Sequence, residues 1–256
     1  LFDNGRVNLI FTLASGLIFL PETFRSINKL KMPVVNFAFD DHLKFVGYPT
    51  PTGWSGSRDI CKYITLTTVS YRPSCEKYLY EGGRPLYVPE AGNDKIHRPL
   101  NLKKDIDVCF VGRNYGSRRL IVEFLKDNGI NIQTYGIDWP NGPVSVEKMV
   151  ELFSRSKIVL GINNAWGGGR FFATCRDFEA TLCGSMYITA ENDRIRECFE
   201  NGKEIVLYKT KEDLLNKIRY YLAHDEEREA IAKAGRERAL KDHTWDKSIE
   251  YIFRFL

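Results

Sequence analysis

The 256-residue sequence predicts an α/β protein with mostly parallel sheets. Short apolar runs of strand length alternate with amphipathic segments of helix length along the whole chain. The alternation is broken over residues 94–105, a segment that contains an Arg-Pro pair and a charged run typical of a linker. We therefore expect an N-terminal domain over 1–93 and a C-terminal domain over 106–256, each built around a parallel sheet.

The two series of elements follow from the apolar patterns between glycines, prolines and polar clusters. In the first series, strands are expected at Val7–Leu13, Pro33–Phe39, Tyr63–Val69 and Pro85–Val88, helices at Glu22–Lys31 and Pro73–Tyr80, and a polar loop over 40–58. In the second series, strands are expected at Asp107–Val111, Asn131–Tyr135, Lys157–Ile162, Met186–Thr189 and Glu204–Leu207, and helices at 117–129, Val146–Phe153, 174–183, Arg194–Phe199, Lys211–Ala223, Glu226–Leu240 and Trp245–Phe255.

Net charge, apolar stretches and cysteine spacing indicate which ligands and which cellular compartment to expect. A net charge of +4 suits an anionic small ligand but is too weak to indicate nucleic-acid binding. The apolar stretch Leu9–Leu20 is too short to span a bilayer, and no cleavable signal pattern precedes it. The six cysteines lack metal-ligand spacing, so thiols in a reducing cytoplasm are expected. Nothing in the sequence specifies an oligomeric state.

The stretch from Gly167 to Gly184 is the most informative part of the chain. A glycine loop that includes Gly168 and Gly169 lies between a predicted strand and a predicted helix, where a phosphate can approach the backbone. Thr174 followed by Asp177 fits a capping box at the start of this helix. Gly184 fits the left-handed residue just beyond its end.

Within that helix, Arg176 and Glu179 are expected to project together beside the glycine loop. Arg176 is placed to neutralise a diphosphate, and Glu179 to accept hydrogen bonds from sugar hydroxyls such as those of a ribose. The alternative is a solvated ion pair three residues apart, which contributes a few tenths of a kcal/mol to helix stability.

Other candidate groups follow the carboxyl ends of the predicted strands, where open α/β sheets bind ligands. Arg113 and Tyr115 follow the first strand of the second series, and Tyr135, Gly136 and Trp139 follow the next. The two aromatic rings could flank a nucleotide base, although aromatics at strand ends are usually core residues. Asn163 could bond a base or sugar edge, or could simply form a turn.

These motifs resemble a known family. The second half of the chain resembles the C-terminal domain of group 1 glycosyltransferases with the GT-B fold, and it is most similar to the CgeB-like branch, named for a spore-maturation protein. The resemblance rests on Val111-Gly112-Arg113, Tyr135-Gly136, Gly161-Ile162-Asn163, Arg176-Asp177-Phe178-Glu179-Ala180 with Cys183-Gly184, the segment 199–205 and His243-Thr244-Trp245. In the first half, Pro33-Val34-Val35, Asp40-Asp41-His42 and the linker Asp94–Pro99 also match.

The resemblance implies two Rossmann-like domains with parallel sheets facing across a cleft, the N-terminal one incomplete and on the acceptor side. It implies a retaining, metal-independent glycosyltransferase with a nucleotide-diphosphate sugar as donor, a UDP-sugar being favoured, and no tightly bound cofactor. Arg113 and Arg176 would be catalytic, stabilising the departing diphosphate. The donor would be bound by Arg113, Tyr115, Tyr135, Gly136, Asn163, Gly168, Gly169, Arg176 and Glu179. The acceptor, a glycan, protein or small molecule, would lie near Asp40, Asp41 and His42.

One departure from the family concerns a pair of glutamates with seven residues between them. Glu179 matches the second, but Phe171 stands at the first position, where the family's acid contacts the donor sugar. A non-catalytic nucleotide-binding or assembly protein with the same fold is therefore the alternative. A dinucleotide oxidoreductase is disfavoured because no Gly-x-Gly-x-x-Gly follows a first strand. His97, in the linker, is given no functional role.

Overall fold

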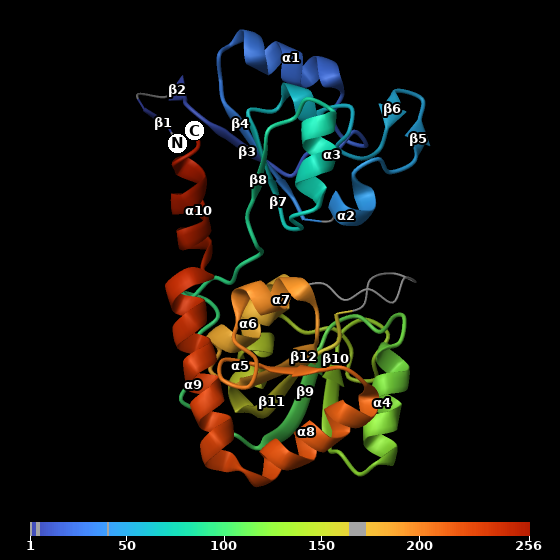
Figure 1. Cartoon of the computed structure of the whole chain (residues 1–256), viewed down its shortest axis with the longest axis vertical. Helices are drawn as coiled ribbons and strands as arrows, with labels where there is room; N and C mark the ends of the chain where they lie inside the picture. The colour runs from blue at the N-terminus through green and yellow to red at the C-terminus, as the bar shows by residue number, and fades with distance from the viewer. Residues whose placement is uncertain (1, 4–5, 40, 164–172) are drawn as a thin grey trace. The chain divides into compact units, whose positions relative to one another are not determined.

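The computed structural model describes residues 2–3, 6–39, 41–163 and 173–256. Their contacts group into two compact units (Figure 1). Unit 1 comprises residues 1–90 and 248–256, and unit 2 comprises residues 91–247. The residues of the predicted linker thus belong to unit 2, and the last residues of the chain belong to unit 1. The domain limits expected from the sequence remain a prediction.

Unit 2 is built on one parallel sheet, as the alternating pattern predicts. The strands lie in the order β10-β9-β11-β12-β13, and every neighbouring pair is parallel. They are β9 (Ile106–Val111), β10 (Ile132–Tyr135), β11 (Ser156–Gly161), β12 (Met186–Ala190) and β13 (Val206–Tyr208). The order reverses between β9 and β11, which makes their carboxyl ends a topological switch point.

Helices cover both faces of this sheet because each carries an apolar stripe. One hydrophobic core joins the sheet to α4, α8 and the first half of α9, and a second core joins it to α5, α6 and α7. The bounds are α4 (Arg118–Asp127), α5 (Val146–Arg155), α6 (Cys175–Leu182), α7 (Asp193–Cys198), α8 (Lys211–Ala223) and α9 (Asp225–Asp242).

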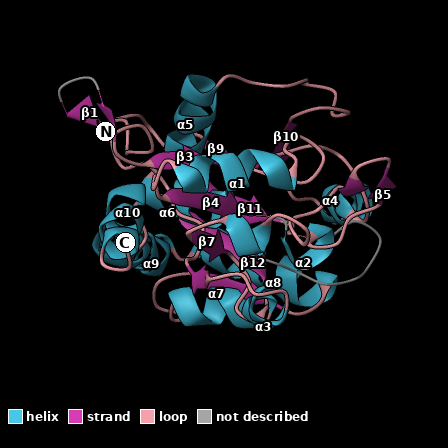
Figure 2. Ribbon diagram, turned by 90° about the horizontal axis from the view of Figure 1, so that it is seen from above, coloured by secondary structure: helices cyan, strands magenta, loops and turns pink. Residues whose placement is uncertain are grey.

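Unit 1 contains a second parallel sheet, in the order β3-β4-β7-β8, of which β3, β4 and β7 are labelled in Figure 2. Its strands are β3 (Ile10–Thr12), β4 (Val34–Ala38), β7 (Leu66–Val69) and β8 (Pro85–Tyr87), and its main helices are α1 (Pro21–Lys29) and α3 (Ser74–Tyr80). Ile252 of α10 (Trp245–Phe253) is completely buried against this sheet, in contact with Leu9, Val35 and Leu66. A two-residue antiparallel pair, β1 (Phe2–Asp3) and β2 (Arg6–Val7), precedes the sheet.

Two expectations for unit 1 were wrong in detail. The strand expected from Tyr63 begins instead as a 3₁₀ turn, η1 (Cys61–Tyr63), and β7 starts at Leu66. The segment expected to be a loop contains α2 (Asp41–Lys44) and a hairpin of β5 (Pro49–Thr50) and β6 (Gly53–Trp54). Side-chain contacts from outside a segment stabilise such short pieces: Asp59 accepts a hydrogen bond from the Trp54 N–H at 2.9 Å.

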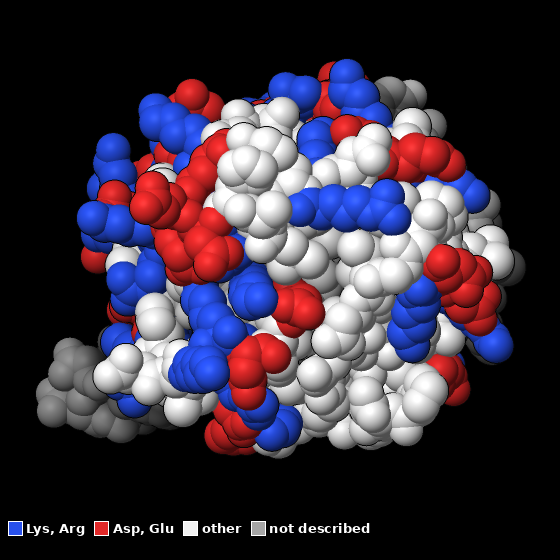
Figure 3. Space-filling view, turned by 90° about the horizontal axis from the view of Figure 1, so that it is seen from below, with Lys and Arg blue, Asp and Glu red and all other residues white. Residues whose placement is uncertain are grey.

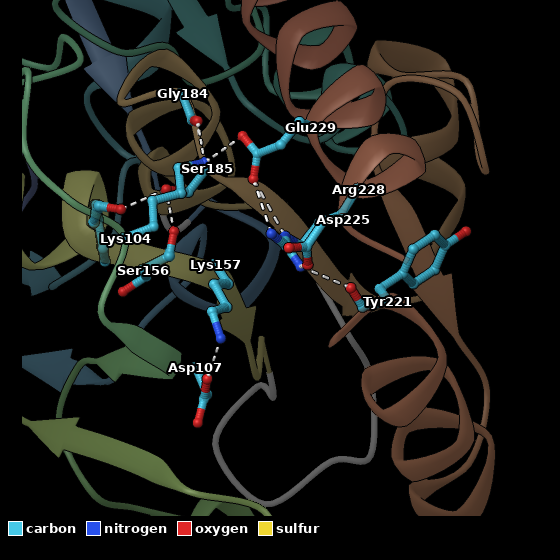
Figure 4. Close-up of polar contacts among 11 residues, drawn as sticks. Lys104, Asp107, Ser156, Lys157, Gly184, Ser185, Tyr221, Asp225, Arg228 and Glu229 are labelled. Carbon is cyan, nitrogen blue, oxygen red and sulfur yellow. Dashed lines mark hydrogen bonds and ion pairs between the residues drawn. The ribbon is translucent and has the colours of Figure 1, made fainter. Parts of the chain in front are cut away.

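Charged side chains at the amino edge of the unit 2 sheet are paired (Figure 4). Lys104 donates to the Gly184 carbonyl and to Glu229, and Lys157 contacts Asp107 at 2.7 Å. Arg228, only 3% exposed, contacts Asp225 and Glu229. These contacts neutralise each charge locally, so this edge offers no uncompensated cation among the residues drawn.

The outer surface carries charges of both signs. On the face shown in Figure 3, lysines and arginines are interspersed with aspartates and glutamates rather than gathered into one basic patch. This mixture does not favour a nucleic-acid surface on that face. Within the described ranges, no helix has both the length and the apolar character needed to cross a bilayer.

Candidate donor site

The candidate site lies at the switch point of unit 2, where loops follow β9 and β11. The first loop carries Arg113 and Tyr115, and the second begins with Asn163. Residues 164–172, which include Gly168, Gly169 and Phe171, lie outside the described residues. The described part of the site therefore consists of the first loop, Asn163 and helix α6.

Helix α6 begins as the sequence predicts. Its capping box is present, with the Thr174 N–H donating to the Asp177 carboxylate at 2.5 Å. Phe178 and Leu182 are completely buried, whereas Arg176 and Glu179 are partly exposed on the other side. Gly184, with φ of +77°, adopts the left-handed conformation expected just beyond the end. The helix thus presents a cation and a carboxylate at the site.

Asp177 does more than cap the helix. The side chain is completely buried and accepts hydrogen bonds from the Asn163 amide at 2.7 and 3.0 Å. Asn163 also lies 3.3 Å from the Thr189 hydroxyl, which joins the ends of β11 and β12 to α6. The same amide is 3% exposed, and its oxygen has no partner among the described residues. Asn163 therefore positions α6.

Burial governs the titration of this network. It raises the pKa of Asp177, and this effect outweighs the hydrogen bonds that favour the carboxylate. Burial and the nearby Asp177 charge raise the pKa of the Tyr187 hydroxyl well above its ordinary value. Both side chains are completely buried, which assigns them to the internal network rather than to the exposed surface of the site.

Arg176 packs against the backbone at the end of β9. A Cβ atom on Gly112 would lie 3.2 Å from Nη1 of Arg176, so the absence of a side chain at Gly112 makes room for the guanidinium. No carboxylate within 4 Å pairs with Arg176 in the described chain, and its buried Nε has no partner there. An arginine held in this way suits an anionic ligand.

A second arginine at this edge, Arg118, is not apparent from the sequence. It is 5% exposed and donates to the carbonyls of Ile162 at 2.9 Å and Arg113 at 2.8 Å. Its guanidinium stacks 4.1 Å from the Tyr115 ring centre. Desolvation lowers the pKa of Arg118, with a smaller contribution from nearby Arg176. Arg118 thus ties together the two loops of the switch point and adds positive charge beneath them.

Arg113 lies at the surface of the first loop. Its guanidinium contacts Asp138 at 3.3 Å, and both side chains are more than half exposed. Such an exposed pair contributes little to stability, so a stronger anion can compete for the arginine. The ring of Tyr115 packs against the Arg118 guanidinium, so in this structure Tyr115 helps to hold Arg118 in place.

The residues that follow β10 mostly shape the backbone. Gly136 has φ of +127°, and a Cβ there would lie 2.3 Å from the Gly112 carbonyl oxygen. Trp139 is 9% exposed, donates to that same carbonyl, and belongs to the core, as the structural alternative predicted. The Tyr135 hydroxyl donates to Gln133 at 2.9 Å. These contacts fix the position of Gly112, against which Arg176 packs.

Glu179 faces His97, a linker residue for which the sequence predicts no functional role. The nearest nitrogen of His97 lies 3.8 Å from its carboxylate, and His97 is 7% exposed. No ion pair within 4 Å joins Glu179 to Arg176 in the described residues. The carboxylate is therefore supported from the predicted linker rather than by its neighbour on the helix.

The acceptor-side candidates lie in unit 1. Asp40 is outside the described residues, and Asp41 and His42 begin α2 without described side chains. Close to them in sequence, a cavity of about 550 Å³ opens at the carboxyl end of the sheet. Lys44 contributes an amine to its lining, and Ser15, Ser55 and Ser57 contribute hydroxyls. The rest of the wall is mostly apolar and includes Leu13, Ala14, Leu17, Phe37, Ala38, Phe39 and Tyr48.

The described residues contain no cluster of three or more side chains suited to a metal ion. All six cysteines fall within them, and no disulfide joins any two. Burial raises the pKa of Cys109 and of Cys183 to about 12, so both thiols stay protonated at neutral pH.

Known structures share this architecture across most of the chain. Sucrose-phosphate synthase of Thermosynechococcus elongatus is 14% identical, with a TM-score of 0.61 over 96% of this chain and 73% of that chain. Anabaena HepE, solved with UDP and glucose, is 13% identical, with a TM-score of 0.69 over 96% and 77%. A glycosyltransferase of Rickettsia africae is 12% identical, with a TM-score of 0.63 over 91% and 78%. These similarities confirm the α/β, GT-B-like fold class.

Sequence comparison identifies the family. No curated protein sequence matches the chain. The family model described as glycosyl transferase-like matches residues 113–254, from the arginine after β9 to the residue just beyond α10. This match spans more than half of the chain and contains Arg176 and Glu179 of the candidate site. The protein therefore belongs to the glycosyl transferase-like family.

Proposed function

We propose that this protein is a glycosyltransferase that moves a sugar from a nucleotide-diphosphate sugar to an acceptor. The observation that carries the proposal is the placement of Arg176. Its guanidinium lies at the switch point of a parallel sheet, against a glycine, with no carboxylate partner among the described residues. Charged groups at the opposite edge of the same sheet are paired.

In the proposed reaction, Arg176 and Arg113 bind the donor diphosphate. Negative charge grows on the diphosphate as its bond to the sugar breaks, and cations already in place stabilise that charge. Arg113 would exchange its exposed contact with Asp138 for this ligand. Because the arginines supply the positive charge, we propose a metal-independent reaction, and on family resemblance a retaining one in the CgeB-like branch.

Glu179 would bind the ribose hydroxyls, and a UDP-sugar is the favoured donor. HepE, a structural neighbour, was solved with UDP-glucose, which supports this choice of probe. We place the acceptor at unit 1. The largely apolar cavity there favours an acceptor with an apolar or aromatic group beside the sugar-accepting hydroxyl. The absence of disulfides among the six cysteines supports the proposed cytoplasmic location.

Calorimetric titration with UDP, GDP, ADP and dTDP in EDTA tests the donor site. We expect one nucleotide to bind, and Arg176→Ala to weaken it by roughly ten- to a hundred-fold, because a charge-assisted contact to phosphate is lost. Arg119→Ala is the matched control, since it removes an arginine from an exposed position on α4. Binding of none of the four, or equal binding by Arg176→Ala, would contradict the donor site. Binding without sugar transfer would favour the non-catalytic alternative.

A further inference from the structure

A histidine from the segment that joins the two sheets is held in one orientation beside helix α6. His97 is 7% exposed, and its ring accepts a hydrogen bond at Nδ1 from the Asn93 N–H at 3.1 Å. Since Nδ1 accepts, the proton of the neutral ring is on Nε2. The N–H of the ring therefore points away from its own loop, toward α6.

Backbone hydrogen bonds and close packing against α6 hold the loop that carries His97 in place. The Asn93 carbonyl accepts from the N–H groups of both Ile96 and His97, at 3.1 and 2.7 Å. Just before it, Gly92 lies so close to α6 that a Cβ there would be 2.4 Å from Leu182 and 3.4 Å from the Glu179 nitrogen. Gly92 also exchanges backbone hydrogen bonds with His243 and Trp245. The hydrogen bonds to Asn93, the packing of Gly92 on α6 and the hydrogen bonds of Gly92 together hold His97 in its position beside α6.

The group that His97 faces is the carboxylate of Glu179. Nε2 of His97 lies 3.8 Å from Oε1, a distance too long for a direct hydrogen bond but short enough for attraction between the N–H dipole and the charge. Among the described residues, His97 is the sole basic side chain within 4 Å of the Glu179 carboxylate. The Glu179 side chain remains 21% exposed, so part of the carboxylate stays open to a ligand.

We propose that His97 is a positioning residue that orients Glu179 for the ribose hydroxyls of the donor, and so determines the preference for ribonucleotides. This inference rests on the proposed role of Glu179 as the ribose-binding residue. A carboxylate with three rotatable bonds loses conformational freedom when it binds a diol. The fixed N–H of His97 restricts the carboxylate beforehand, which favours binding of a ribose over a sugar without those hydroxyls.

Two substitutions at His97 separate this role from support of the loop. His97→Asn places an oxygen near the Nδ1 position, so it keeps an acceptor for Asn93 but removes the N–H toward Glu179. His97→Gln places an amide N–H₂ near the Nε2 position, so it keeps the donor toward Glu179. A purely structural histidine would be replaced better by asparagine, and a positioning histidine better by glutamine.

The readout is the ratio of the calorimetric affinities for UDP and 2′,3′-dideoxy-UDP. For the unmodified protein, UDP should bind more tightly, and Glu179→Ala should remove the difference. We expect His97→Asn to lower UDP affinity about five-fold, as if one hydrogen bond between Glu179 and a ribose hydroxyl were lost, and to leave 2′,3′-dideoxy-UDP affinity unchanged. His97→Gln should retain most of the ratio.

The remaining outcomes would contradict, in turn, the role of His97, the role of Glu179 and the choice of a UDP-sugar as donor. If His97→Asn keeps the ratio of the unmodified protein, or lowers both affinities equally, His97 does not position Glu179. If Glu179→Ala keeps the ratio, Glu179 is not the ribose ligand and the inference falls while donor binding stands. If UDP does not bind at all, the proposed UDP-sugar donor falls, and the inference with it.

Discussion

At the scale of single residues, the polar network at the start of α6 depends on a glycine that faces it. Gly161 ends β11, and a Cβ there would lie 2.1 Å from the Tyr187 hydroxyl and 2.5 Å from the Thr189 hydroxyl. Both neighbours are completely buried, so neither can move away freely. We expect Gly161→Ala to lower the free energy of unfolding by about 2 kcal/mol, measured by urea denaturation.

The matching control removes the atom that the new methyl group would approach most closely. Tyr187→Phe deletes the hydroxyl while keeping the ring, so the double variant should be more stable than the sum of the two single effects predicts. Strictly additive effects would show that the Tyr187 hydroxyl is not what makes Gly161 necessary.

Residues in local motifs could be predicted from the sequence, and residues paired over long separations could not. The capping acid Asp177 and the left-handed Gly184 follow from spacing alone. The contact between His97 and Glu179 and the reach of Arg118 to Ile162 bring together distant segments. The spacing of residues along one sequence does not indicate such contacts, because they form only once the strands have taken their order in the sheet.

At the scale of elements, the first turn of α6 contains a buried acid, Asp177, whose titration affects the free energy of unfolding. Burial raises the pKa of Asp177 above its ordinary value of 3.8. As the pH rises through that value, the unfolded chain loses its proton first, so Asp177 lowers the stability of the folded protein until the folded carboxyl also ionises. We expect the stability of the unmodified protein relative to Asp177→Asn to fall as the pH rises from about 3.5 to 7.

Urea denaturation at several pH values measures this difference in unfolding free energy. Asp127→Asn, at an exposed position near the end of α4, is the control for the general effect of removing one carboxylate. A difference that stays constant would mean that the hydrogen bonds from Asn163 and Thr174 balance burial, and one that rises with pH would mean that they outweigh it.

Most elements could be predicted because each carries its own pattern, as β11 and α8 illustrate. The apolar run of β11 and the cap and apolar stripe of α8 are visible without any tertiary contact. The hairpin β5–β6 could not be predicted, because its strands have two residues each and depend on the contact of Trp54 with Asp59. Elements too short to show a period are specified by tertiary contacts rather than by pattern.

At the scale of the whole molecule, the chain leaves unit 1 after Glu90 and contributes its last residues to that unit again. The pattern of α10 predicts an amphipathic helix but not which core receives its apolar side. Ile252 is completely buried among Leu9, Val35, Leu66, Leu86 and Val88 of unit 1. The C-terminal residues are therefore part of the N-terminal core, which a linear division at the linker does not predict.

We expect Ile252→Ala to destabilise unit 1 by about 3 kcal/mol, because it removes a fully buried branched side chain and leaves a cavity. Hydrogen exchange should show lost protection in β3, β4 and β7, with β9, β11 and β12 of unit 2 unchanged. Arg254→Ala, at an exposed position on the same turn of chain, is the control. Equal loss of protection in both sheets would mean that the two units unfold as one, and that α10 stabilises the whole molecule rather than the core in which Ile252 lies.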